Sequence, residues 1–161
     1  MLNTKNLTLL ATLLLMRLSM LGANINGLYT TGTISVSNSN GANAPLYIGG
    51  NLVTATNDDM MEPTTCEISI VDDSKIVLAG DFLHNATNGN VFSESTQATS
   101  AQFEFKGTQL QNIRPYTATV PDKETLYIHF PNITINNNKH VLISPQIAVR
   151  TTDINLPVGW L

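Results

Sequence analysis

Apolar and polar residues alternate along most of the chain after residue 23. Cys66, Ile68 and Ile70 form one such run, and Ile76 and Leu78 begin the next. A period of two is that of a β-strand with one buried face, and glycine, asparagine, aspartate and proline break the pattern into short pieces. No stretch in this part of the chain has a convincing helical period. The pattern therefore predicts an all-β protein built from short strands.

The short strands recur in a repeated unit. Residues 46–54, LYIGGNLVT, have apolar residues and a glycine at the same places as residues 76–84, IVLAGDFLH, and FEFKG at 103–107 matches the start of that phrase. Residues 68–84 also align without a gap with residues 133–149. The shared pattern is apolar-x-apolar, a polar turn, then apolar-x-apolar-x-Gly-Asp/Asn-apolar. These alignments place the start of the second strand of the unit at residues 46, 76, 103 and 141.

A strand of about three residues is too short to be stable alone, so each unit must stack on the next, with parallel pairing between coils. Glycine at the second corner lets the chain bend sharply. We therefore predict a single-domain parallel β-solenoid, or β-helix, over residues 24–161. An antiparallel β-sandwich is the alternative, but a sandwich has no reason to repeat residue by residue. Ten residues are expected to face inward in stacked columns, namely Ile68, Ile70, Ile76, Leu78, Phe82, Ile133, Ile135, Val141, Ile143 and Ile147. Three glycines are expected at the repeat turns, namely Gly50, Gly80 and Gly107.

Residues 1–23 have the order of a secretory signal peptide. Lys5 lies near the start, an apolar run follows at residues 7–16, and small residues end the segment at Ala23. This order predicts cleavage after Ala23 and export of residues 24–161. The alternative is a retained N-terminal membrane anchor, which is the only membrane contact that the sequence predicts. In both cases we expect the remaining chain at the cell surface, in the extracellular space or in the periplasm.

Three phrases of the repeats stand out, namely GDFLHN at 80–85, FEFKGTQLQNI at 103–113 and FPNITINNNKHVLIS at 130–144. They resemble the repeats of large exported surface proteins of Bacteroidetes. The resemblance covers roughly residues 46–149 and implies a β-helix-like stalk or adhesin segment on or outside the outer membrane. This chain is short, and residues 151–161 do not resemble the C-terminal sorting domain that many such proteins carry, so a truncated or stand-alone relative is expected.

Composition and charge argue against several kinds of site. Only 12% of residues are charged, the net charge is −4, and the eight lysines and arginines are scattered, which argues against a nucleic-acid groove. Cys66 is the only cysteine, so neither a disulfide within the chain nor a cysteine zinc site is expected. His84, His129 and His140 lack a paired ligand spacing and are expected at the surface. We therefore expect no metal and no cofactor.

Few residues are candidates for a surface site. Asp72 and Asp73 are expected outside the coil at a turn, and Arg114 is the only arginine in the middle of the chain. β-Helix enzymes that act on polysaccharides need clustered external acids with a basic partner, and these three residues are the candidates for such a cluster. The acidic loop at 57–63 lacks a glycine for wrapping calcium and is expected to be a solvated turn. Trp160 is expected to cover an open end of the solenoid.

Three functions fit these patterns. The favoured one is a non-catalytic exported structural or adhesive surface module, whose partners would be surface glycans or other surface proteins. The second is a carbohydrate-binding module, or a polysaccharide lyase or hydrolase, on the same scaffold. Exposed aromatic residues on one coil face, with Arg114 close to Asp72 and Asp73, would favour it. The third is a subunit of an extracellular fibre or phage particle, because bare solenoid ends can add neighbours.

Overall fold

Short parallel strands make up the molecule. The computed structural model describes residues 24–30, 33–37, 45–55, 66–70, 73–85, 91–93, 100–116 and 126–158. Within these ranges the structure is all-β, and every pair of neighbouring strands is parallel. The predicted β-solenoid of short strands is confirmed, and parallel pairing excludes the antiparallel β-sandwich.

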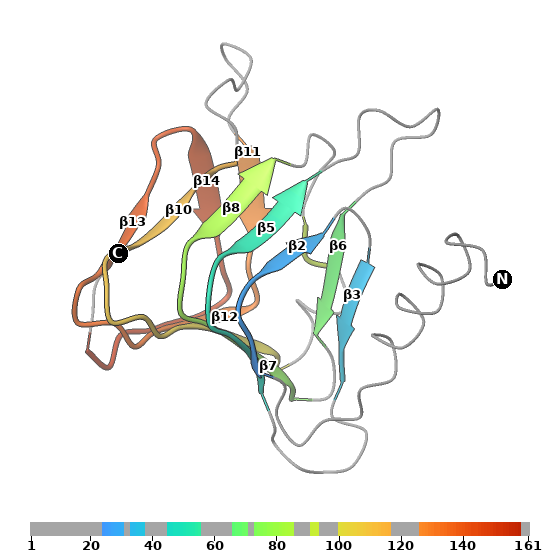
Figure 1. Ribbon diagram of the computed structural model, residues 1–161, viewed down its shortest axis with the longest axis horizontal. Coiled ribbons are helices and arrows are strands. Elements are labelled where there is room, and N and C mark those ends of the chain that lie inside the picture. The colour runs from blue at the N-terminus through green and yellow to red at the C-terminus, as the bar shows by residue number, and fades with distance from the viewer. Residues whose placement is uncertain are drawn as a thin grey trace, which may run out of the picture.

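The strands form two larger sheets and a third face (Figure 1). The six-stranded sheet has the order β1 (Asn24–Ile25), β4 (Leu46–Ile48), β7 (Lys75–Leu78), β9 (Gln102–Phe105), β12 (Asn132–Ile135) and β15 (Ile154–Asn155). The five-stranded sheet has the order β2 (Leu28–Thr30), β5 (Leu52–Ala55), β8 (Phe82–Asn85), β10 (Gln111–Pro115) and β13 (Val141–Ile143). The third face contains two strand pairs, β3 (Thr33–Val36) with β6 (Glu67–Ile70), and β11 (Leu126–His129) with β14 (Ile147–Arg150). Phe92 extends the first of these pairs through a parallel bridge to Ile68.

The two predicted signal and cap segments, residues 1–23 and Trp160, lie outside the described residues. No helix in the described part of the chain is long and apolar enough to cross a membrane.

The register between coils corrects one of the predicted alignments. Leu46 pairs with Ile76, Ile76 with Phe103, and Phe103 with Ile133, all in the six-stranded sheet. The predicted start at Val141 is therefore wrong, because Val141 begins β13 in the five-stranded sheet. The gapless alignment of residues 68–84 with 133–149 matches strands on different faces. It arose because all three faces carry the same apolar-x-apolar pattern, so a shift by one face preserves the match.

The core lies between the faces and is centred on aromatic rings. Nine of the ten residues predicted to face inward are buried, and Ile143 is half-buried against the same core. All five phenylalanines are buried with ring centroids 5.0 to 6.3 Å apart, and they are Phe82, Phe92, Phe103, Phe105 and Phe130. These rings come from all three faces of the solenoid, so one cluster joins the sheets. Cys66, predicted to point inward with Ile68 and Ile70, is also buried.

Polar side chains tie successive coils together at the corner between the two larger sheets. The Asn51 side-chain oxygen accepts the backbone N–H of Asp81 (2.9 Å). One coil further on, the Asp81 carboxylate accepts the backbone N–H of Asn112 (2.8 Å) and its side-chain N–H (3.1 Å). This ladder gives a structural reason for aspartate or asparagine after the glycine in the repeated phrase.

A second ladder of amide side chains is buried beside the first. The Gln111 side chain donates to the carbonyl oxygens of Leu78 (3.0 Å) and Gly80 (2.6 Å) in the coil before it. Asn137, from the following coil, donates to the Gln111 side-chain oxygen (2.8 Å). Buried polar groups are costly unless hydrogen-bonded, and here each amide satisfies backbone or side-chain groups of a neighbouring coil. The ladders therefore help to fix the register of the stack.

The corner glycines are needed because the coils approach closely there. A Cβ atom on Gly80 would lie 2.5 Å from the carbonyl oxygen of Gly50 and 2.6 Å from the side-chain oxygen of Asn51. A Cβ on Gly107 would lie 2.7 Å from the carbonyl oxygen of Ala79. None of the three glycines has a left-handed backbone, so the reason differs from the conformational freedom expected from the sequence. Space between coils is the constraint.

Replacing Gly80 with alanine is expected to lower the free energy of unfolding by about 1–3 kcal/mol, because the added methyl group overlaps the backbone of the coil below. Urea denaturation measures the change. Gly27→Ala is the matched control, since its Cβ would meet the Asn51 carbonyl oxygen at an ordinary 3.5 Å. Equal stability of the two variants would contradict close stacking at this corner.

Candidate functional site

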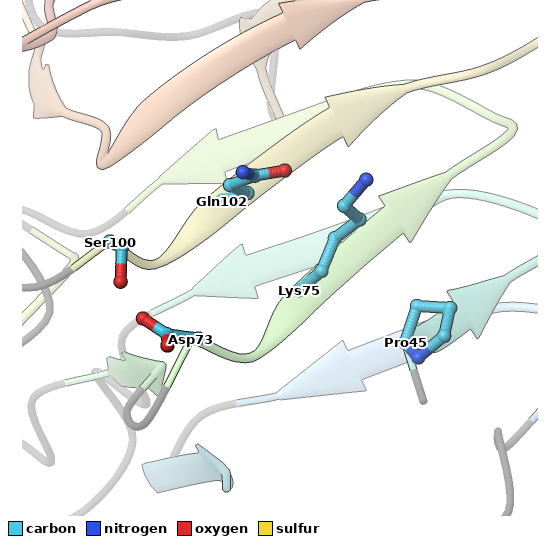
Figure 2. A pocket seen from close by; sticks show the side chains of 5 residues that line it. All are labelled: Pro45, Asp73, Lys75, Ser100 and Gln102. Atoms are coloured by element: carbon cyan, nitrogen blue, oxygen red, sulfur yellow. The ribbon is translucent and has the colours of Figure 1, made fainter. Parts of the chain in front are cut away.

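A polar hollow lies on the outer face of the six-stranded sheet. It has a volume of about 430 Å³ and is lined by Pro45, Asp73, Lys75, Ser100 and Gln102. Figure 2 shows Asp73 and Ser100 where the chain enters β7 and β9, with Lys75 and Gln102 on those strands. The hollow therefore crosses the entry ends of three neighbouring strands.

The positive charge in the hollow is already compensated. Lys75 Nζ lies 3.0 Å from a carboxylate oxygen of Glu104, which is only 7% exposed on the outer face of β9. Asn136 donates to the other carboxylate oxygen (2.9 Å). Burial alone would raise the pKa of Glu104, but the hydrogen bonds from Asn136 and Lys75 and the charges of Lys75 and Lys106 outweigh it, so the pKa is lowered. Lys75 is thus held as half of an ion pair.

The remaining lining groups can donate and accept hydrogen bonds. Asp73 is exposed and has a left-handed backbone, with φ of 57°, while Ser100 and Gln102 contribute a hydroxyl and an amide. No group of three histidine, cysteine, aspartate or glutamate residues that could hold a metal ion occurs in the described ranges. The hollow can accommodate a small polar group.

The predicted cluster of Asp72, Asp73 and Arg114 is not assembled. Asp72 lies outside the described residues. Asp73 precedes β7, whereas Arg114 lies on β10 in the other sheet and forms an ion pair with Asp81, which follows β7. Residues 74–80, which include the four residues of β7, separate the two aspartates, so Asp73 and Asp81 lie beyond opposite ends of that strand. Arg114 therefore pairs with Asp81, a member of the hydrogen-bonded ladder at the corner between the two larger sheets.

Two exposed tyrosines meet on the outer face of the five-stranded sheet. Tyr29 on β2 is 57% exposed and Tyr116, just after β10, is 42% exposed, yet their ring centroids are only 5.8 Å apart in an edge-to-face contact. Between them lie β5 and β8, so the two backbones are separated by three strand spacings, about 14 Å. The side chains must therefore lean toward each other across the sheet.

Apolar residues lie in the same row as Tyr29 on this outer face. Tyr29 pairs in register with Val53, and Val53 with Leu83. Leu83 is only 6% exposed although it points to the outer face. We call the surface formed by Tyr29, Val53, Leu83 and Tyr116 the tyrosine platform.

The sequence did not reveal the tyrosine platform. Tyr29 and Tyr116 are far apart in the chain, and they meet only because four coils stack in a definite register. The one usable signal is that Tyr116 lies two residues after Arg114 and so shares its outward side of the strand.

The prediction that His84 is a surface residue is wrong. Its side chain is fully buried, with Nδ1 2.8 Å from the hydroxyl oxygen of Thr54 in the coil before it. Nε2 is buried without a hydrogen-bond partner. Burial lowers the pKa of His84 from 6.5 to about 4, so the ring is neutral at pH 7. Of the other histidines, His140 is exposed and His129 is half-buried.

The acidic loop at 57–63 lies outside the described residues, so its predicted character stays a prediction.

The chain matches no protein-family model, no curated protein and no solved structure. The candidate binding sites are therefore the two outer surfaces described above, the polar hollow and the tyrosine platform.

Proposed function

We propose that the protein is an exported, non-catalytic surface module that attaches to other molecules through the tyrosine platform. The supporting observation is that Tyr29 and Tyr116 remain 57% and 42% exposed while packed against each other, on the sheet face that carries Val53 and Leu83 in the row of Tyr29. Tyrosine combines a large apolar ring with a polar hydroxyl, which is why it is enriched where proteins bind partners. A contiguous exposed apolar and aromatic surface marks interaction sites more often than scattered single residues do.

The scaffold supports this proposal. Parallel strands, the phenylalanine cluster and the corner ladders hold Val53 and Leu83 in one row, so the platform is built on regular strands rather than on loops. A site on rigid elements binds with less loss of conformational freedom. Export to the cell surface, and the resemblance to surface proteins of Bacteroidetes, belong to the same proposal. They rest on residues 1–23 and on the repeated phrases.

The test is retention of beads coated with the full-length protein on surfaces bearing polysaccharide, protein or phospholipid. We expect retention on at least one coating, and a loss of about tenfold or more in the Tyr29→Ala/Tyr116→Ala variant, because each aromatic contact contributes on the order of 1 kcal/mol. Tyr127→Ala is the matched control, since Tyr127 is also 42% exposed but lies on β11 of the third face. Absence of retention on every coating, or equal retention of the double variant, would refute the proposal.

A further inference from the structure

The tyrosine platform continues directly into a polar pair. Leu83 on β8 pairs in register with Arg114 on β10, so the outward row runs Tyr29, Val53, Leu83, Arg114. Apolar and charged groups thus lie side by side on one sheet surface.

The polar pair is fixed in place but still open to solvent. Arg114 Nε lies 3.7 Å from a carboxylate oxygen of Asp81, and the two side chains are 48% and 20% exposed. The other carboxylate oxygen of Asp81 accepts hydrogen bonds from Asn112, which orients the carboxylate. A guanidinium has five N–H donors, and the contact with Asp81 is made through Nε, so in this proposal the Nη groups of the 48% exposed side chain are the donors offered to a ligand. The pair therefore offers donors and an acceptor at one edge of the platform.

This combination matches the chemistry of a sugar ring. A pyranose has a face of C–H groups, which packs on an aromatic ring, and a rim of hydroxyl groups, each of which both donates and accepts. Tyr29 and Tyr116 provide the aromatic surface, and Arg114 and Asp81 provide donors and acceptors at its edge. The charges of the pair cancel, so the platform has no surplus cation that would select a uronic acid or another acidic polymer.

We infer that the ligand of the tyrosine platform is a neutral polysaccharide whose pyranose rings carry vicinal hydroxyl groups. The sugar faces stack on Tyr29 and Tyr116, and neighbouring hydroxyls bond to Arg114 and Asp81. This inference rests on the proposed attachment function and names its ligand class.

Native gel electrophoresis in the presence of soluble polysaccharide tests the ligand class with the full-length protein. The neutral probes are galactomannan, xyloglucan and a β-1,3-glucan, and the acidic probe is polygalacturonate. We expect at least one neutral probe to retard the protein and polygalacturonate to leave its mobility unchanged. Retardation should fall by about tenfold in apparent affinity in Arg114→Gln, which removes charge-assisted hydrogen bonds. It should disappear in Tyr29→Ala/Tyr116→Ala and persist in Tyr127→Ala.

A further variant covers the case in which the alanine variant does not fold. Tyr29→Phe/Tyr116→Phe keeps both rings and removes only the hydroxyls, so it should retain at least a third of the apparent affinity. Complete loss of binding in this folded variant would overturn the stacking role. Tyrosine-dependent bead retention without retardation by any neutral probe would overturn the glycan assignment and leave the attachment function standing. Retardation by polygalacturonate alone would also overturn it. If the beads are not retained on any coating and no polysaccharide retards the protein, both proposals are refuted.

Discussion

Replacing Phe103 with alanine is expected to lower the free energy of unfolding by about 3–5 kcal/mol. Phe103 is fully buried, and its ring centroid lies 5.1 to 5.7 Å from those of four other phenylalanines. Truncation removes apolar contacts on every side and leaves a cavity, which the surrounding strands cannot close because their ladders fix the spacing between coils. Urea denaturation followed by far-UV circular dichroism measures the loss.

The control for this variant is again Tyr127→Ala, which is expected to cost less than about 1 kcal/mol because the residue is 42% exposed and lies outside the buried core. A loss below about 1 kcal/mol for Phe103→Ala would contradict a single cluster that joins the three faces. A loss confined to one step of a two-step transition would indicate that the coils unfold separately, as repeat proteins can.

The stacked architecture could be predicted because stacking constrains which positions of the sequence are apolar. Inward positions at the same level of successive coils must all be apolar, so residues 46–54 and 76–84 carry the same pattern, and they do pair in register. The number of faces per coil was not readable in this way. All three faces use similar short strands, so an alignment between different faces looks as good as the correct one.

The burial of His84 was readable from parity but was not predicted. Phe82 and His84 lie two apart on β8, so they point to the same side, and Phe82 was predicted to face inward. Histidine is intermediate in its tendency to be buried, and the surface expectation rested on the lack of a paired ligand spacing rather than on parity. Thr54, its hydrogen-bond partner, lies thirty residues away and could be identified only once the coil register was known.

The surface sites depended on information that no single strand contains. Tyr29 and Tyr116 meet across three strand spacings. Arg114 forms an ion pair with Asp81, which follows β7, and not with Asp73, which precedes it. A residue's outward direction follows from local alternation, but its neighbours on that face follow from coil order. Sequence reasoning therefore reached the fold and the core, whereas the platform required the structure.

Lowering the pH from about 6.5 to about 4 is expected to reduce the free energy of unfolding by about 3 kcal/mol through His84 alone. Its pKa is about 4 in the folded protein and 6.5 in the unfolded chain, so above pH 6.5 both states are neutral and the group has no effect. Between these two values the unfolded chain binds a proton that the folded protein does not, which favours unfolding. Below about pH 4 both states are protonated, and the loss reaches a plateau.

The neighbours of His84 explain why its charge is disfavoured in the fold. Nδ1 meets the hydroxyl of Thr54, Phe82 lies beside the ring, and Pro115 is its partner in β10, so no carboxylate among these groups compensates an imidazolium. Urea midpoints between pH 7.5 and 4 measure the effect. In His84→Gln the decline over this range should shrink by about 3 kcal/mol, whereas His140→Gln, at an exposed position, should keep it.

Glu104 provides an internal check on this assignment, because its contribution appears in a different range. Its pKa is lowered in the fold, so the stability that it adds is present above the unfolded value of 4.5 and is lost only as the pH falls below it. Loss of stability that begins near pH 6.5 therefore reports on a histidine, and loss that begins below 4.5 reports on carboxylates. An unchanged decline between pH 6.5 and 4.5 in His84→Gln would mean that His84 does not sit neutral in the core. If this decline disappears in His84→Gln and persists in His140→Gln, one buried imidazole is the origin of the acid sensitivity of this solenoid.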